Sequence, residues 1–244
     1  MTASAATILE HLKAVDAERQ RRAALPELNA RVVVLKQYQQ RRFAHTYADL
    51  LLSTRYGAAA RYFLDELYGP KDFSRRDDQF ARVAPTLARL FPNELAETVV
   101  TLAELHALSE TLDTEMGAQL PGERIGGVDY IRAWRGVGRP RDRARQIELT
   151  LGVAARLDRV TRLPLLRHSL RLMRGPASAA GLAELQRALE TGFDTFSNMN
   201  GAQEFIVIVG AREREFAAAL FASAPDDADD LVSMERALAS LPAA

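Results

Sequence analysis

The sequence has no cysteine and only four histidines. The absence of cysteine from 244 residues excludes disulfide bonds, thiolate metal ligands and a cysteine nucleophile, and it is typical of a cytoplasmic protein. No stretch approaches the roughly 20 consecutive apolar residues of a membrane-spanning helix, and the first residues lack the pattern of a secretory signal. We therefore expect a cytoplasmic protein with no membrane partner.

Signatures of common enzyme and cofactor-binding classes are also missing. The glycines form neither a Gly-x-x-x-x-Gly-Lys-Ser/Thr phosphate loop nor a Gly-x-Ser-x-Gly nucleophile elbow. The paired Glu-x-x-His repeats of di-iron bundles do not occur either. We predict no metal site and no cofactor. The four histidines are His11, His45, His106 and His168.

What the chain does contain is a helical pattern interrupted by proline and glycine. Hydrophobic residues make up 48% of the sequence, enough for a folded core, and the period-2 alternation of strands is absent. We predict an all-α fold, a multi-helix bundle of roughly eight to ten helices, in one domain or two tightly packed lobes. The clearest amphipathic pattern, predicted to be core, consists of Leu182, Leu185, Leu189, Phe193 and Phe196.

Glycine and proline are concentrated between Leu120 and Pro140, which marks the predicted break between two parts of the chain. We assign an N-terminal helical lobe to residues 1–122. A C-terminal lobe, residues 123–223, is predicted to pack on it as one globular unit. Residues 224–244 are predicted to form an acidic linker and a short amphipathic tail helix. The sequence leaves open whether this tail docks on its own chain or on a partner.

Individual helix boundaries follow from breakers and caps. One long helix is predicted from about residue 28 to residue 53. Another is predicted to begin at Pro164 and to end at Gly175-Pro176, because proline lacks the amide hydrogen that a helix interior needs. Ser178 is predicted to cap the helix that follows.

The segment YFLDELYGPKDFSRRD, residues 62–77, joins a helix break to a helix start. Gly69-Pro70 ends one helical pattern, and Ser74 precedes the next with the spacing of a capping box. The opposite charges here make Arg75 and Arg76 candidate binding residues. A salt-bridged, capped corner between two helices explains the same residues without a ligand.

This segment, together with LRLMRGP at 170–176 and FSNMNGAQEF at 196–205, resembles an uncharacterised family of all-helical bacterial proteins that carry a YGPKDFSRRD-like segment. The resemblance covers roughly residues 28–222. It implies a bacterial origin and a helical fold. No activity or functional residue is known for that family, so the resemblance assigns none to this chain.

Candidate catalytic residues lie on a helix predicted from residue 94 to about residue 117. Its apolar stripe contains or adjoins His106, Ser109, Glu110 and Asp113, and polar groups on a buried face need partners. A histidine beside carboxylates is the minimum for acid–base chemistry, although a core histidine with satisfied hydrogen bonds fits the same pattern. A second candidate pair is His45 and Asp49, one helical turn apart, although a solvated face or an interhelical hydrogen-bond pair explains the same spacing.

Positive charge is unevenly distributed although the chain is neutral, with 32 basic and 32 acidic residues. Between Arg124 and Arg174 there are thirteen arginines and four acidic residues, an excess of nine positive charges. Nucleic acid is the weaker choice of partner, because no recognised binding motif or interleaved exposed aromatics accompany the arginines. One predicted helix face, with Arg167, His168, Arg171 and Arg174, is a candidate anion-binding surface, and a solvated arginine face paired with neighbouring acidic residues explains the same pattern.

These observations favour a non-enzymatic protein-interaction or regulatory module that binds a protein partner or a second copy of itself. The uneven charge, the tryptophan-bearing segment near Trp134 and the amphipathic tail offer contact surfaces. The alternative is a small-molecule- or metal-binding helical enzyme with a buried polar site around His106.

Overall fold

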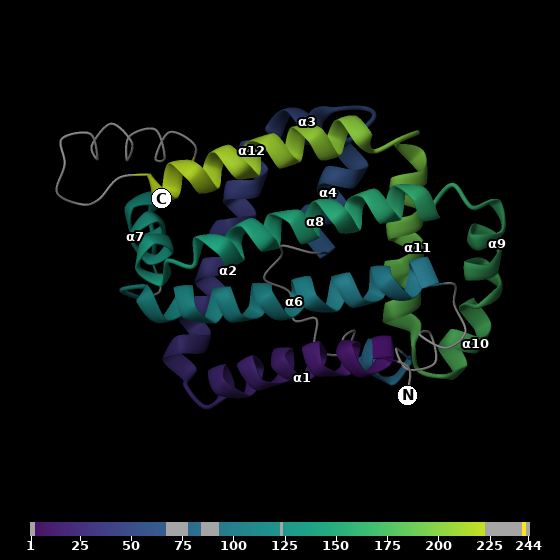
Figure 1. The fold of residues 1–244 in the computed structure, drawn as a ribbon, viewed down its shortest axis with the longest axis horizontal. Coiled ribbons are helices and arrows are strands. Elements are labelled where there is room, and N and C mark those ends of the chain that lie inside the picture. Colours follow the sequence, from purple (N-terminus) through teal and green to yellow (C-terminus); the bar gives the residue numbers. More distant parts are fainter. Residues whose placement is uncertain (1–2, 67–77, 84–92, 123, 223–240, 243–244) are drawn as a thin grey trace.

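The computed structural model describes residues 3–66, 78–83, 93–122, 124–222 and 241–242. Every regular element in these ranges is a helix and none is a strand, which confirms the predicted all-α fold (Figure 1). With the helical residues 78–83, the described ranges contain twelve helical segments, slightly more than predicted. The others are α1 (Ala3–Ala23), α2 (Pro26–Thr46), α3 (Ala48–Leu52), α4 (Gly57–Glu66), α6 (Asn93–Gln119), α7 (Gly127–Val137), α8 (Pro140–Val160), α9 (Pro164–Leu172), α10 (Arg174–Ala179), α11 (Ala183–Asn198) and α12 (Gln203–Phe221).

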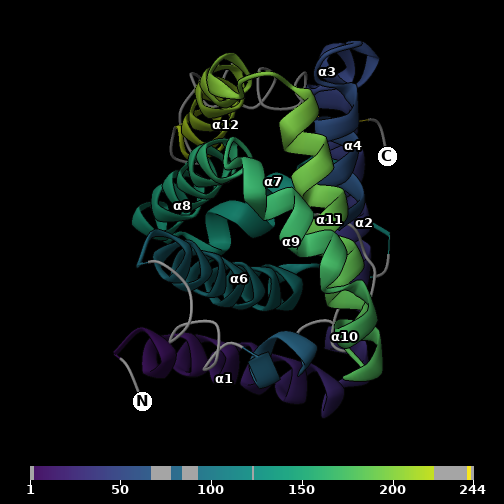
Figure 2. The same cartoon turned by 90° about the vertical axis from the view of Figure 1, so that its right-hand side faces the viewer.

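The long helices form two layers that cross each other. In one layer α1, α6, α8 and α12 lie side by side in that order, and each packs on the next. In the other layer α2, α4 and α11 run across the first, as the turned view shows (Figure 2). The short α7 closes one end of the bundle, and α9 and α10 lie at the opposite end.

Two hydrophobic clusters hold the layers together, and each combines residues from before and after residue 122. The first joins Phe43 of α2 and Phe63 of α4 to Phe205 of α12. In the second, Tyr38 of α2 packs on Tyr130 of α7 with ring centroids 5.0 Å apart. The two clusters place α2 and α12, which are far apart in the sequence, in one core.

The end of the chain contacts this core as well. Leu241 is buried in the second cluster, and the Tyr38 hydroxyl donates to the Pro242 carbonyl oxygen over 3.4 Å. The described part of the tail therefore docks on its own chain. Residues 223–240, which include most of the predicted linker and tail helix, lie outside the described residues, as does the predicted corner at Gly69-Pro70 and Ser74.

The predicted long helix from 28 to 53 is interrupted at one residue. Tyr47 leaves helical geometry with φ −116° and ψ 26°, so α2 ends at Thr46 and α3 begins at Ala48. The Tyr47 ring packs on Phe43 at 4.5 Å, and its hydroxyl donates to Oε1 of Glu213 on α12 over 2.6 Å. These contacts hold Tyr47 buried at the interruption. They arise from tertiary packing, which the spacing of apolar residues along the sequence does not indicate.

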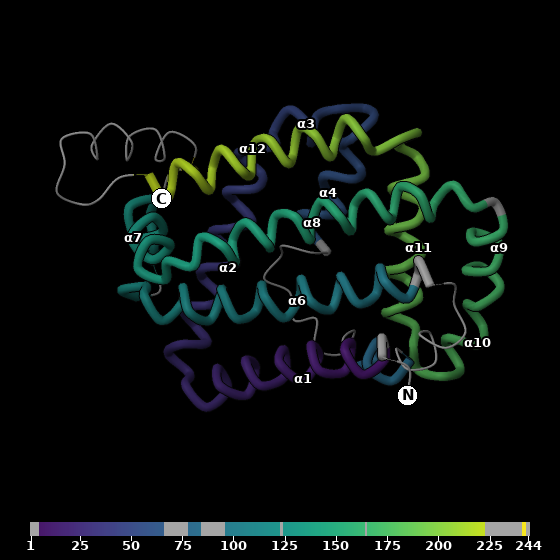
Figure 3. Tube along the Cα trace, in the orientation of Figure 1, coloured from purple at the N-terminus to yellow at the C-terminus, as the bar shows by residue number. Residues whose placement is uncertain are grey.

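The prediction that Gly175-Pro176 ends a helix was wrong. The helix from Pro164 ends at Leu172, and the separate helix α10 follows it (Figure 3). Gly175 and Pro176 lie in the first turn of α10, where proline is tolerated because first-turn amides have no helical acceptor. Ser178 lies inside α10 and caps nothing, since the residue before α11 is Leu182 and makes no side-chain cap.

Leu185, Phe193 and Phe196 of the predicted core pattern are buried, whereas Leu182 is half-buried and lies just before α11, and Leu189 is 47% exposed. Close crossing of α11 and α4 depends on Gly192. A Cβ atom there would lie 2.8 Å from the Tyr62 hydroxyl oxygen, and that hydroxyl donates to the Ala188 carbonyl oxygen over 3.3 Å. Glycine thus lets the tyrosine of α4 reach the backbone of α11.

Among the helices that the structure describes, none combines the length and the apolar character needed to cross a membrane.

Candidate functional site

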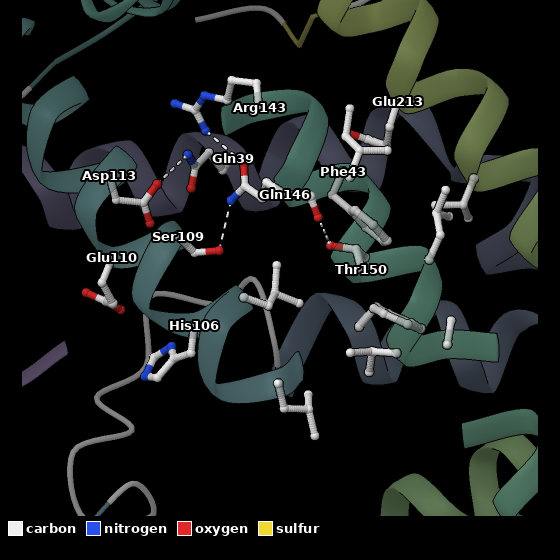
Figure 4. A pocket seen from close by; sticks show the side chains of 18 of the residues that line it. Gln39, Phe43, His106, Ser109, Glu110, Asp113, Arg143, Gln146, Thr150 and Glu213 are labelled. Carbon is white, nitrogen blue, oxygen red and sulfur yellow. Dashed lines mark hydrogen bonds between the residues drawn. The ribbon is translucent and has the colours of Figure 1, made fainter. Parts of the chain in front are cut away.

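A cavity of about 310 Å³ lies between the two layers. Its walls come from α1, α2, α4, the helical residues 78–83, α6, α8, α11 and α12, with α7 at one end. Figure 4 shows the polar side chains Gln39, Ser109, Asp113 and Gln146 close together, with Phe43 next to Gln146 and near Thr150 and Glu213. The cavity is about twice as large as the ~150 Å³ apolar cavity that accepts benzene in an engineered protein. It therefore has room for a small organic molecule.

Glu110 on α6 is held by two cations from different helices. Its Oε2 accepts from Arg22 Nη2 of α1 at 2.5 Å, and its Oε1 accepts from Lys36 Nζ of α2 at 2.6 Å. The side chains of Arg22 and Glu110 are each 8% exposed. Burial alone would raise the pKa of Glu110, but Lys36 and Arg22 together lower it to about 2. Glu110 is thus a fixed negative charge that joins α1, α2 and α6.

Asp113, one turn further along α6, has weaker partners. Its Oδ1 accepts from Gln39 Nε2 at 2.9 Å, and Lys36 Nζ is 3.9 Å from its Oδ2. Burial raises the pKa of Asp113 despite the attraction of Lys36, and the nearby charge of Glu110 adds to the rise. The pKa values of two carboxyl groups one turn apart on α6 are therefore shifted in opposite directions. The pKa of Glu110 is lowered, which favours its ionised form, and that of Asp113 is raised, which favours its protonated form.

A chain of polar contacts connects α8 to α6 across the cavity. Arg143 Nη1 donates to Gln146 Oε1 over 3.1 Å, and Gln146 Nε2 donates to Ser109 Oγ over 2.8 Å. The Arg143 guanidinium lies over the Trp134 ring, 3.9 Å from its centroid, and Nη2 donates to Met116 Sδ over 3.0 Å. The stacking and the hydrogen bonds fix a buried cation in the wall of the cavity.

A second polar group lies between α2 and α12. Arg42 is 5% exposed, binds Glu213 through Nη1 and lies over the Phe216 ring at 4.7 Å. Two buried donors on the walls, Arg42 Nε and Trp134 Nε1, have no hydrogen-bond partner within the described structure. Buried donors without acceptors are rare in native proteins, and they call for an acceptor that the described chain does not provide.

The four candidate residues on α6 all line this cavity: His106, Ser109, Glu110 and Asp113. His106 lies one turn from Glu110 and its charge contributes to the low pKa of that carboxyl group. The candidate acid–base pairing is thus replaced by a network in which Ser109 accepts from Gln146 and Glu110 binds two cations. In the described part of the chain no group of three or more histidine, aspartate or glutamate residues could hold a metal ion.

The second candidate pair is not formed. Asp49 makes a bidentate salt bridge with Arg212 of α12, with both N–O distances 2.7 Å, and His45 is exposed. The hydrogen bond from Arg212 lowers the pKa of Asp49. Asp49 therefore ties α3 to α12, and the pair does not face the cavity.

The candidate basic face is divided between two helices, because Arg167, His168 and Arg171 lie on α9 and Arg174 begins α10, and α11 partly neutralises it. Arg167 Nε lies 2.9 Å from Asp194 Oδ1, and Arg174 Nε donates to Glu190 Oε1 over 2.7 Å. The remaining members of the face, His168 and Arg171, are exposed. Arg75 and Arg76 lie outside the described residues.

Sequence reasoning missed the polar residues that the other helices contribute to the cavity. Lys36 and Gln39 are three residues apart on α2, and Arg143 and Gln146 have the same spacing on α8. Such i, i+3 polar pairs share one helix face, so they were visible as a pattern. Which face turns inward depends on the packing of α2 and α8 against α6, and this the sequence does not show.

Fold and cavity together define an all-α protein with a buried polar site between two layers of helices. The chain belongs to the family described as Domain of unknown function (DUF8198), whose model matches residues 18–227. This agrees with the resemblance to an uncharacterised family. Comparison with curated proteins and with solved structures gave no match.

Proposed function

We propose that this protein binds a small organic molecule in the cavity between its two helical layers. The observation that carries the proposal is a cavity of about 310 Å³ whose walls combine an apolar surface with convergent polar groups and carboxyl groups of shifted pKa. Such a combination is typical of ligand sites. It reverses the preference from sequence alone, which placed a protein-interaction module first and a buried site around His106 second.

The single tryptophan provides a direct test. Trp134 lines the cavity, so a ¹H–¹⁵N spectrum contains one indole peak that reports on the site. We expect neutral one- and two-ring compounds such as benzene and naphthalene to shift this peak in a saturable way. Organic extracts of the purified protein, examined by mass spectrometry, should also contain a small molecule bound in stoichiometric amount.

A cavity-filling variant with a matched control makes the test specific. Thr150 on α8 lines the cavity, and its hydroxyl donates to the carbonyl oxygen of Gln146 over 2.8 Å. Thr101 on α6 makes the same backbone contact to Glu97 but does not line the cavity. Thr150→Phe should weaken the binding of naphthalene, because the added ring takes up part of the cavity, and Thr101→Phe should preserve it. Equal binding by both variants would contradict the proposed function.

Interaction with another protein, or with a second copy of the chain, remains a second candidate because α9 exposes its apolar side chains. Leu165 is 78% exposed and Leu172 is 66% exposed, while Arg167 of the same helix pairs with Asp194. An amphipathic helix that turns leucines outward offers a contact surface. Light scattering should show a concentration-dependent mass that falls on Leu165→Ser/Leu172→Ser. The control is Leu52→Ser on α3, where the leucine is 86% exposed.

We also propose that the protein is bacterial and that it lies in the cytoplasm. The resemblance of the segments around residues 62–77 supports the origin. The absence of cysteine supports the compartment, because nothing in the sequence requires an oxidising environment. Cell fractionation with an antibody against the protein tests the compartment.

A further inference from the structure

The charges around the cavity favour an anion. The charged side chains of the described walls are the three carboxyl groups Glu110, Asp113 and Glu213 and the three cations Lys36, Arg42 and Arg143, and Arg22 adds a fourth cation that binds Glu110. The described groups therefore leave an excess of one positive charge in a largely buried region. A buried charge excess is costly unless an ion of opposite sign compensates it.

Hydrogen-bond donors also exceed good acceptors on these walls. Arg143 Nη2 donates to the thioether sulfur of Met116, which is a weak acceptor. Arg42 Nε and Trp134 Nε1 are buried without a partner in the described residues. A ligand that brings acceptor oxygens, through small side-chain rotations, would satisfy Arg42 Nε and Trp134 Nε1, which have no acceptor in the described structure.

Asp113 is the wall carboxyl group that an anionic ligand would meet. Burial raises its pKa, so a proton on Asp113 costs less than it would in water. Protonation removes the repulsion toward a second carboxylate, and the Asp113 hydroxyl then becomes a donor. Asp113 can therefore become neutral beside an anion, whereas Glu110 keeps its negative charge.

We propose that the ligand is a small hydrophobic carboxylic acid, with its carboxylate accepting hydrogen bonds from Arg143 and its apolar body lying among Phe43, Leu151 and Phe205. The proposal rests on the proposed function, because it names the ligand class of the same cavity. Since the cavity has about twice the volume that benzene needs, a two-ring acid matches its size.

Three compounds of nearly equal size separate charge from shape: 2-naphthoate, 2-naphthamide and 2-naphthylmethylamine. Each is titrated into the full chain while the Trp134 indole peak is followed. A charge-assisted pair with an arginine should give the carboxylate an affinity about tenfold higher than that of the amide. The amine, which repels the same arginine, should bind most weakly.

Variants then locate the contact. Arg143→Gln should reduce the ratio of carboxylate to amide affinity to about one, a readout that a merely structural role would not change. Asp113→Asn should keep the carboxylate preference or increase it, because it removes a competing charge. Arg145→Gln is the matched control, since Arg145 lies on the same helix, is exposed and pairs with Glu104 at 2.7 Å.

The outcomes distinguish this inference from the proposed function. Equal or tighter binding of the amide or the amine, or a carboxylate preference that survives Arg143→Gln, overturns the carboxylic acid proposal while leaving a binding cavity in place. If naphthalene and all three derivatives leave the indole peak unchanged, the proposed function and this inference both fail.

Discussion

Replacing Glu110 by glutamine should destabilise the protein by about 3 kcal/mol. The substitution leaves the Arg22 guanidinium, 8% exposed, without a carboxylate, and breaking a buried pair in this way typically costs about 3–5 kcal/mol. We expect the lower end, because Lys36 is 22% exposed and can reach water. The pKa of Glu110 gives a similar figure, since a decrease from 4.5 to about 2 corresponds to roughly 3 kcal/mol.

The stability difference between the wild type and Glu110→Gln should depend on pH with a defined sign. The pKa of Glu110 is lower in the folded protein than in the unfolded chain, so its contribution is complete above about pH 4.5. It is lost as the pH falls from 4.5 toward 2. The stability difference between the wild type and Glu110→Gln should therefore be constant near neutral pH and should shrink below pH 4.5.

Urea denaturation of both proteins at pH 7 and at pH 3.5 measures these quantities. The matched control is Glu104→Gln on the same helix, whose pair with Arg145 is surface-exposed and should contribute less than about 1 kcal/mol. The double variant Arg22→Met/Glu110→Gln should lose less than the sum of the single variants. A Glu110→Gln effect no larger than that of the control would refute the description of this pair as a buried charge network.

Two further substitutions test packing and surface charge. Gly192→Ala should be less stable than Gly152→Ala by about 1–3 kcal/mol in thermal melting, because a Cβ atom would displace the Tyr62 hydroxyl at the first site and meets nothing within 4 Å at the second. A smaller difference would mean that the tyrosine moves freely. Arg212→Gln should raise the pKa of Asp49 toward its ordinary value, as an NMR titration would show, and should cost less than about 1 kcal/mol because Asp49 is largely exposed. An unchanged Asp49 pKa would contradict the salt bridge.

The sequence was sufficient for the fold class because helical periodicity is a local property. Apolar spacing in the residues of α11 identified a buried face from one segment alone. Boundaries that depend on tertiary contacts were not visible. The interruption at Tyr47 requires Glu213, which is 166 residues away, and the placement of Pro176 within α10 depends on where a first turn begins.

The candidate site was only partly predictable for the same reason. His106 and Asp113 could be assigned to one side of α6, because their spacing is fixed by a single helix. Gln39 and Arg143 come from helices whose inward faces are decided by packing, so their polar side chains looked like ordinary surface residues. Asp49 shows the same limit, because its partner Arg212 comes from α12 and the spacing of residues along one helix does not indicate it.

The pairing of α2 with α12 also sets how long α2 remains without its partner helix during synthesis. Arg42 and its partner Glu213 are 171 residues apart, so during synthesis α2 leaves the ribosome long before the carboxylate that neutralises its arginine. At about 5–20 residues per second this interval is roughly 10–30 s. Throughout it, the apolar faces of α2 and α4 have no α12 to cover them. A chain of this topology should therefore depend on chaperones during translation more than its all-helical composition suggests.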